Sequence, residues 1–388
     1  MLNRSEVARL RRKETSAQTD RTWNYLCTAG GETQATDDFT CKDRVTCQAL
    51  LGQGICESDI TFDGLAGLHQ SIVFCTKNTN HAKFIPVNKF TPEHLPKEYR
   101  DKDVYDCVER LITLGVILKV GYTSENRPPG YPFSDVAGSD IMKHHRMGSG
   151  SVFIPKHRPK GSCCPCQRCR DSPQPSQTWH FIWVSTALHV VFDDLEASQT
   201  EVGWQFNDIT CRESITWMQG IRLVNFDLKS DRCILECVTH DTDIQDSIHR
   251  ARSFLRKKER ELNEKYLQGT SNGQPGLAVI ISHPHGYPKQ VSLGTDIRRN
   301  HIKDKCPGVE WTEYVYDAPT CRGSSGALVW LLGQMRVGYR DGEITTHTHR
   351  GSCGDTTNMS GFGLDWVTQH TSSDGSESTC NLASLHVS

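Results

Sequence analysis

The stretch TCRGSSGA, residues 320–327, places a serine on a glycine-flanked turn directly before the apolar segment 328–332. Glycine adopts backbone angles that are closed to other residues, so Gly323 and Gly326 permit a tight turn around Ser325. In such a turn the N–H groups of Gly323 and Ser325 point to one place, where they can stabilise an oxyanion. Gly–Ser turns are common, so the motif indicates a nucleophile only together with a base and an acid.

Two further segments offer that base and that acid. His189 ends the sequence TALH (186–189) after an apolar strand, and Asp231 begins DRCIL (231–235) at the mouth of another strand. Each residue alone is more often structural or a solvated turn residue. Their order and spacing along the chain are more informative. His189 precedes Asp231 by 42 residues, and Asp231 precedes Ser325 by 94. The His-Asp-Ser template has the same order, with spacings of roughly 45 and roughly 93.

In these three segments the chain resembles the trypsin-like serine peptidases, the family with the chymotrypsin fold. The turn GSG (148–150) is also similar to the small-residue turn that precedes the histidine-bearing strand in that family. The segment IISHPHG (280–286) resembles an element of the intracellular, HtrA-like branch, in which an apolar strand leads into Pro and Gly. The resemblance extends over residues 106–368.

The resemblance implies a mainly β fold, with two antiparallel six-stranded β-barrels and the active site in the cleft between them. It also implies a serine endopeptidase that hydrolyses peptide bonds through an acyl-enzyme and requires no cofactor. Ser325 would be the nucleophile, His189 the general base and then acid, and Asp231 the residue that orients it. Gly323 and Ser325 would form the oxyanion hole, and the partners would be protein or peptide substrates.

The chain also departs from the pattern of the secreted members. Ser324 stands before the nucleophile, where secreted trypsins have an aspartate that pairs with a newly cleaved N-terminus. No basic residue followed by IVGG precedes the barrel, so we do not expect activation by that ion pair. Six residues before the nucleophile stands Pro319 rather than an acid. We therefore expect a preference for apolar or aromatic residues rather than for Arg or Lys.

The rest of the sequence is consistent with a barrel pair, because many short strands are separated by turns. Apolar residues at helical spacing predict one helix, inserted between strands and packed on the barrel surface, over 241–267. The segments with strand character are 71–75, 111–122, 148–153, 179–184, 221–226, 233–238, 277–282, 327–332 and 334–339.

The chain divides into three parts by composition. Residues 1–103 form an N-terminal extension of unknown role, partly ordered, whose last segment (92–103) has two prolines and many charges and is typical of a linker. Residues 104–368 form the peptidase domain. Residues 369–388, rich in Ser and Thr, form a tail that we expect to be disordered.

Charge and hydropathy limit the kinds of binding partner and the cellular compartment that we expect for this protein. The 44 basic and 46 acidic residues nearly balance, which gives no reason to expect nucleic acid as a partner. No signal peptide and no apolar stretch long enough for a membrane span is present, so we expect an intracellular protein of the cytoplasm or nucleus, without a membrane partner. The 17 cysteines suggest disulfides, yet the odd count and the absence of an export signal favour free thiols.

The densest cysteine cluster, CCPCQRC (163–169), has the C-x-x-C spacing with which two thiolates hold Zn²⁺. A structural zinc site using Cys163, Cys166 and Cys169 is one interpretation, in which Cys164 could take the place of Cys163. Free or disulfide-bonded cysteines in an exposed loop are the other interpretation. Cys321 and Cys353 flank the expected specificity pocket, at positions where secreted relatives often have a disulfide. Two reduced, buried cysteines are the alternative that we favour. His347 and His349 lie nearby and are expected at the surface or in the pocket lining rather than on a metal.

Two other classes of protein are compatible with this sequence. A catalytically silent pseudoprotease would keep the double barrel as a protein-binding module. A zinc-organised interaction protein would use the Gly-Ser motif as a structural turn only. Geometry distinguishes these alternatives, because an active site needs Ser325, His189 and Asp231 in one cluster.

Overall fold

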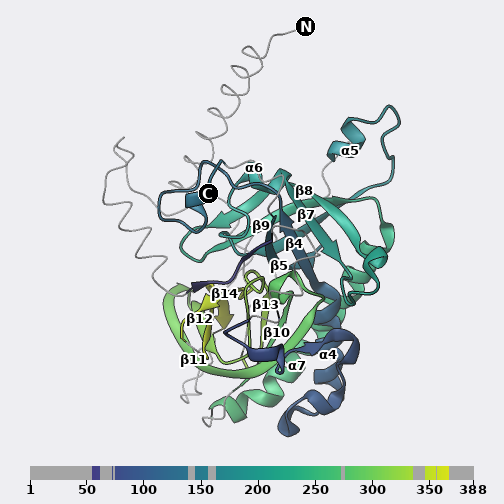
Figure 1. Ribbon diagram of the computed structural model, residues 1–388. Coiled ribbons are helices and arrows are strands. Elements are labelled where there is room, and N and C mark those ends of the chain that lie inside the picture. The colour runs from purple at the N-terminus through teal and green to yellow at the C-terminus, as the bar shows by residue number, and fades with distance from the viewer. Residues whose placement is uncertain are drawn as a thin grey trace.

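The computed structural model describes residues 55–61, 72, 75–138, 145–155, 163–271, 276–334, 346–354 and 356–366. Within these ranges the chain is mainly β and forms two antiparallel sheets, one above the other in Figure 1. This is the chymotrypsin-like double barrel that the sequence predicts. None of the helices in the described ranges is both long enough and apolar enough to cross a membrane.

The first sheet closes into a barrel of six strands, because β5 pairs with both β4 and β6. A further short strand, β2, lies beside the start of β5. The members of this sheet are β2 (Asp59–Thr61), β4 (Gly115–Val120), β5 (His145–Phe153), β6 (His180–Thr186), β7 (Thr200–Trp204), β8 (Thr216–Asp227) and β9 (Arg232–Thr239).

The second sheet curls without closing as fully. Its ends approach at an isolated bridge between Leu328 and Thr348. β1 lies at one edge next to β14, and β3 pairs with the first residues of β11. The members of this sheet are β1 (Ile55–Cys56), β3 (Ile85–Pro86), β10 (Leu277–Ser282), β11 (Gln290–Cys306), β12 (Val309–Tyr316), β13 (Leu328–Leu332), β14 (His349–Ser352), β15 (Asn358–Ser360) and β16 (Gly363–Trp366).

Two long helices, α4 (Lys102–Leu114) and α7 (Thr242–Ser271), pack together on the outside of the barrels (Figure 1). The helix predicted over 241–267 is confirmed as α7. Its residues Ile244, Ile248, Ala251 and Leu255 are buried, as their helical spacing requires. The shorter helices are η2 (Thr79–His81), η3 (Val87–Lys89), η4 (Pro92–His94), η5 (Lys97–Tyr99), η6 (Ser134–Val136), α5 (Gln167–Arg170), α6 (Asp194–Ser198), η7 (Arg212–Ser214) and η8 (Pro284–Gly286).

The strand predicted over 111–122 is wrong in its first part. Residues 111–114 are the last turn of α4, and the strand begins at Gly115. Val104, Cys107, Val108 and Leu111 are buried at helical spacing, so the amphipathic helix continues into the aliphatic run. Density of aliphatic residues alone does not distinguish a buried helix end from a strand.

The segment 92–103 is not the linker that its prolines and charges suggest. It forms η4, η5 and the start of α4, and Leu95 and Tyr99 are buried in the main core. Strands β1, β2 and β3 also pair with strands of the two barrels from the N-terminal side of residue 104. The division of the chain at residue 104 remains a prediction.

The strands predicted at 148–153, 179–184, 221–226, 233–238, 277–282 and 327–332 are confirmed to within one or two residues at most ends. The strand predicted at 334–339 lies outside the described residues apart from Gln334, and that at 71–75 lies outside them apart from Ile72 and Cys75. The tail 369–388 lies wholly outside them. The hairpin of β11 and β12 was not predicted, because many charged residues interrupt its apolar pattern.

Candidate active site

His189 and Asp231 form a buried hydrogen-bonded pair. His189 follows β6, and Asp231 lies in the turn between β8 and β9. Nδ1 of His189 lies 2.6 Å from Oδ2 of Asp231, and the backbone N–H of His189 donates to Oδ1 at 2.9 Å. The carboxylate therefore holds both the ring and the backbone of the same residue, which fixes the orientation of the imidazole.

Each residue of this pair stabilises the charged form of the other. Burial by itself lowers the pKa of His189, but the Asp231 carboxylate raises that pKa above its ordinary value. Burial likewise raises the pKa of Asp231, while the imidazole holds that pKa below its ordinary value. Asp231 stays ionised and accepts the Nδ1 proton, so Nε2 is the basic nitrogen of the ring. Among the described residues no hydrogen bond to Nε2 is formed, although the Cys56 thiol lies close enough to influence the pKa of the ring.

Ser325 lies on a turn that is bonded to both barrels. The Ser149 N–H of β5 donates to the Ser325 carbonyl at 2.8 Å, and the Gly326 N–H donates to the carbonyl of His349 in β14, also at 2.8 Å. Gly323 and Gly326 have φ of 91° and 85°, in the left-handed region. Both glycines therefore adopt the backbone angles that the predicted tight turn requires.

The N–H groups of Gly323 and Ser325 converge on a single oxygen atom. That atom is the backbone carbonyl oxygen of Glu57, which lies 2.6 Å from the Gly323 nitrogen and 3.2 Å from the Ser325 nitrogen. The Glu57 N–H donates to Oγ of Ser325 at 2.9 Å, and this Oγ donates to the carbonyl oxygen of Arg350 at 3.3 Å. A peptide group of the chain thus occupies the position of the predicted oxyanion hole.

The segment 55–61 links the two barrels, because it pairs with one strand of each. Ile55 and Cys56 pair antiparallel with Ser352 and Gly351 of β14. On the other side of Glu57, residues 59–61 pair antiparallel with β5, in the register Asp59 with Met147. Cys56 lies near His189, and Glu57 contacts Ser325. Adjacent residues of this segment therefore lie beside both groups.

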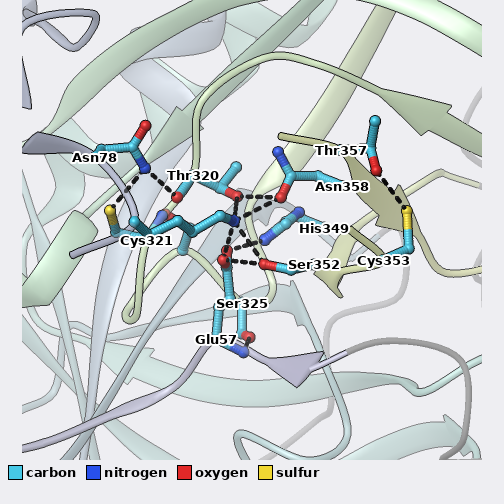
Figure 2. A network of polar contacts seen from close by, with 12 residues as sticks. Glu57, Asn78, Thr320, Cys321, Ser325, His349, Ser352, Cys353, Thr357 and Asn358 are labelled. Atoms are coloured by element: carbon cyan, nitrogen blue, oxygen red, sulfur yellow. Dashed lines mark hydrogen bonds and ion pairs between the residues drawn. The ribbon is translucent and has the colours of Figure 1, made fainter. Parts of the chain in front are cut away.

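The side chain of Glu57 enters a polar pocket. Oε2 lies 2.7 Å from Nε2 of His349, and Oε1 accepts a hydrogen bond from Oγ of Ser352 at 2.6 Å. Nζ of Lys77 forms an ion pair with Oε1. Figure 2 shows Ser352 and His349 turned toward Glu57. The Glu57 carboxylate thus has an ammonium, an imidazole and a hydroxyl partner.

Lys77 is itself held by the pocket wall. Its Nζ donates to Oγ1 of Thr320 at 3.1 Å, to Oγ of Ser352 at 2.6 Å and to Oδ1 of Asn358 at 2.7 Å. Burial by itself raises the pKa of Glu57, but hydrogen bonding to His349 and the charge of Lys77 hold that pKa well below its ordinary range. Burial lowers the pKa of His349, so its imidazole is neutral and donates to Glu57 from Nε2.

Sequence reasoning placed His349 in the pocket lining and placed Cys321 and Cys353 beside the pocket. The structure has His349 there, with Cys321 buried on one side and Cys353 exposed near Thr357 (Figure 2). The sequence did not indicate Glu57 or Lys77 as site residues. Both come from the N-terminal region, and neither stands in a motif, so only the folded chain reveals their contact with residues more than 240 positions away.

The cysteine cluster folds around a residue that the sequence did not suggest. Sγ of Cys164, Cys166 and Cys169 lie 3.1, 3.8 and 3.4 Å from Nε2 of His240. Of the two alternatives for the third cysteine, Cys164 lies in this group, whereas Cys163, named in the possible zinc set, is exposed and lies outside it. Cys163 is exposed although its neighbour Cys164 is buried.

A second cluster of metal-binding side chains lies beside the pocket. It joins Cys75 and His81, from the segment before β3, to His285 of η8 and Cys321. Sγ of Cys75 and Nε2 of His81 each lie 3.5 Å from Sγ of Cys321. These contacts attach the segment that carries Lys77 to the second barrel.

No family model matches the sequence, and no curated protein matches it either. Solved structures with a similar fold include the Rv3671c protease of M. tuberculosis in its inactive form, at 12% identity and a TM-score of 0.34. That alignment covers 69% of this chain and 90% of the other. A variant of the HtrA-type protease AlgW, solved with a decapeptide, has 14% identity and a TM-score of 0.33, over 68% of this chain and 62% of the other. A likeness at this level concerns the fold alone.

Proposed function

We propose that this chain is a serine endopeptidase in which Ser325 is the nucleophile, His189 the general base and Asp231 the residue that orients it. One observation carries the proposal. The N–H groups of Gly323 and Ser325 hold the carbonyl oxygen of a peptide group whose own N–H contacts Oγ of Ser325. A site that binds a peptide carbonyl in this way stabilises the oxyanion formed when Oγ attacks.

The proposed reaction has two steps. Oγ of Ser325 attacks the carbonyl carbon and transfers its proton to Nε2 of His189, while Asp231 stabilises the imidazolium. The imidazolium then protonates the leaving amine, and the carbon–nitrogen bond breaks to leave an acyl-enzyme. A water molecule, deprotonated by His189, hydrolyses the ester. For the first step Oγ must rotate about χ1 from the Arg350 carbonyl toward Nε2, a change between staggered rotamers.

The test is hydrolysis of an unfolded protein together with labelling by a fluorophosphonate. We expect Ser325→Ala to abolish labelling and to lower turnover by about 10⁴-fold or more. Ser214→Ala, an exposed serine of η7, is the matched control and should retain both activities. Labelling that persisted in Ser325→Ala would assign the nucleophile to another residue.

A second candidate function is a catalytically silent, peptide-binding module. The observation that favours it is that Oγ of Ser325 bonds to Glu57 and Arg350, with no hydrogen bond to His189 among the contacts of the described residues. This candidate predicts that the wild-type chain binds peptides but never reacts with a fluorophosphonate. Labelling of the wild-type chain at Ser325 rules it out.

A further inference from the structure

The segment 55–61 has the features of a bound substrate. It is extended, it pairs antiparallel with β14 before Glu57 and with β5 after Ser58, and it places one carbonyl oxygen between the two N–H donors. The Glu57–Ser58 peptide bond follows that carbonyl directly. In the proposed mechanism this bond therefore stands where a peptide is cleaved.

We infer that the cleft selects glutamate immediately before the cleaved bond, and that residues 55–61 occupy it in cis as a substrate of the chain itself, with Glu57–Ser58 as the cleavable bond. The inference rests on the proposed function. It replaces the apolar or aromatic preference expected from Pro319, because the pocket wall presents a cation, an imidazole and hydroxyl groups.

The pocket chemistry fits a glutamate better than other side chains. Lys77 and His349 are both donors, so a carboxylate satisfies them, whereas the amide nitrogen of glutamine would face a donor. An aspartate is one methylene shorter and would not reach His349 and Lys77 together. An apolar side chain would leave the half-buried Lys77 ammonium without its anionic partner, which is unfavourable.

The expected cleavage is a hydrolysis and needs no further reagent. Oγ of Ser325 bonds to the carbonyl carbon of Glu57, its proton passes through His189 to the nitrogen of Ser58, and the carbon–nitrogen bond breaks. Water then releases Glu57 as a new C-terminal carboxylate. The products are residues 1–57 and 58–388.

The first experiment follows the full-length chain by intact-mass spectrometry during incubation. We expect conversion to two fragments of 57 and 331 residues, with no conversion in Ser325→Ala or in Glu57→Ala. Ser214→Ala, which changes an exposed serine of η7, is the control and should be converted as the wild type is. A cut elsewhere, or an intact chain in spite of labelling at Ser325, would overturn cis-cleavage but not the proposed function.

The second experiment measures specificity on a peptide series that differs only before the cleaved bond, with Glu, Gln, Asp, Phe or Lys. We expect kcat/KM for Glu to exceed that for Gln and Phe by about 100-fold or more. Lys77→Met should reduce the Glu-over-Gln ratio about tenfold or more, whereas Lys83→Met, which removes the same charge from an exposed position, should leave it unchanged. Equal rates for Glu and Phe would overturn the assigned preference, and no hydrolysis or labelling at all would overturn the proposed function.

A separate observation carries a second inference. Both cysteine–histidine clusters bring four ligand atoms within 4.8 Å of one another. In a tetrahedral zinc site sulfur and nitrogen ligands lie about 3.3–3.8 Å apart, given Zn–S and Zn–N bonds of about 2.3 and about 2.0 Å. The Sγ–Nε2 and Sγ–Sγ separations in the two clusters, from 3.1 to 3.8 Å, fall close to that range.

We propose that each cluster binds one structural Zn²⁺: one through Cys164, Cys166, Cys169 and His240, the other through Cys75, His81, His285 and Cys321. Thiolate and imidazole ligands in this number suit zinc. Each site would also join segments distant in sequence. The second one would attach residues 75–81, and with them Lys77, to the turn that precedes Ser325.

The test is elemental analysis of the intact, folded chain. We expect two zinc ions per chain, reduced to one in Cys166→Ser and to one in Cys75→Ser. Cys163→Ser and Cys211→Ser, both at exposed positions outside the clusters, should retain two. A folded chain free of metal overturns both sites. A ratio of one overturns the site whose cysteine variant leaves the zinc content unchanged.

Discussion

The hydroxyl of Tyr316 lies 2.7 Å from Nδ1 of His349, and Nε2 of the same ring lies 2.7 Å from the carboxylate of Glu57. Burial raises the pKa of Tyr316 well above its ordinary value, so the phenol stays protonated and donates to Nδ1. The neutral ring therefore carries its proton on Nε2, facing the pocket. Under the proposed specificity for glutamate, Tyr316 is a positioning residue that acts through His349.

Replacing Tyr316 by Phe should release the His349 tautomer without changing the nucleophile. We expect the Glu-over-Gln ratio of kcat/KM to fall about tenfold, the worth of one hydrogen bond in a buried site. The rate of fluorophosphonate labelling at Ser325 should stay unchanged, because the reagent carries no glutamate side chain that would bind His349. An unchanged ratio would mean that Tyr316 supports the fold alone.

Replacing Asp231 by Asn should abolish orientation of the imidazole while it preserves the shape of the site. The expected loss in kcat is about 10⁴-fold. Because the Asp231 carboxylate raises the pKa of His189, the wild-type rate should increase with pH as the imidazole loses its proton, and this inflection should move to lower pH in the variant. Asp243→Asn, at an exposed position near the start of α7, serves as the control in the same pH series.

Replacement of Gly326 by Ala should destabilise the chain more than replacement of Gly308, for a steric reason. Both have positive φ, of 85° and 77°. A Cβ at Gly326 would lie 2.1 Å from Oγ1 of Thr186 and 2.3 Å from the carbonyl oxygen of Ser149, whereas a Cβ at Gly308 would contact nothing within 4 Å. We expect Gly308→Ala to cost about 1–2 kcal/mol of unfolding free energy, from backbone strain alone.

Gly326→Ala should cost more than that, because the turn must also move away from β5 and β6. Urea unfolding of the two variants side by side measures the difference. Equal losses would show that the turn relaxes freely, and Ser325 would then be less firmly positioned than its backbone hydrogen bonds suggest.

Lys289 should make the stability of the chain depend on pH. Its Nζ is buried and donates to the carbonyl of Ile112 at 2.8 Å, and burial lowers its pKa from 10.5 to about 7. The unfolded chain therefore binds this proton more tightly than the folded chain between about pH 7 and pH 10.5. Through this group, the free energy of unfolding rises with pH over that window.

Lys289→Met should remove this contribution, since a methionine of similar length carries no proton. We expect the unfolding free energy of the variant to change less between pH 7 and pH 9 than that of the wild type, as measured by urea denaturation. Lys83→Met provides the comparison for a lysine at the surface. An identical pH slope in Lys289→Met and wild type would contradict the lowered pKa.

The parts of this molecule that sequence patterns predict are those with local causes. The spacing of Ile244, Ile248 and Ala251 predicts a helix because an amphipathic helix needs that period. The glycines around Ser325 predict a tight turn because few other residues adopt its angles. His189 and Asp231 are predictable from order and spacing, and the structure brings them into direct contact.

The parts that escaped prediction depend on pairing between distant segments. Nothing in the composition of residues 55–61 indicates that they pair with β14 and β5, because short strands gain their stability from partners and not from their own sequence. In the sequence, Lys77 cannot be distinguished from an ordinary surface lysine. Only the folded chain shows that it donates to Thr320, Ser352 and Asn358. His240 could not be assigned to the cysteine cluster, since more than 70 residues separate them.

Glu57 and Lys77 stand on opposite sides of the Glu57–Ser58 bond along the chain. If that bond is cut, the anion leaves with the first fragment, while the cation stays tethered to the barrels by Cys75 and His81. The mature pocket would then be charged, complete and open, and the departed fragment would become a competitor for it. The new C-terminal carboxylate of that fragment would make the fragment a product inhibitor. Its occupancy of the pocket would fall as the protein is diluted.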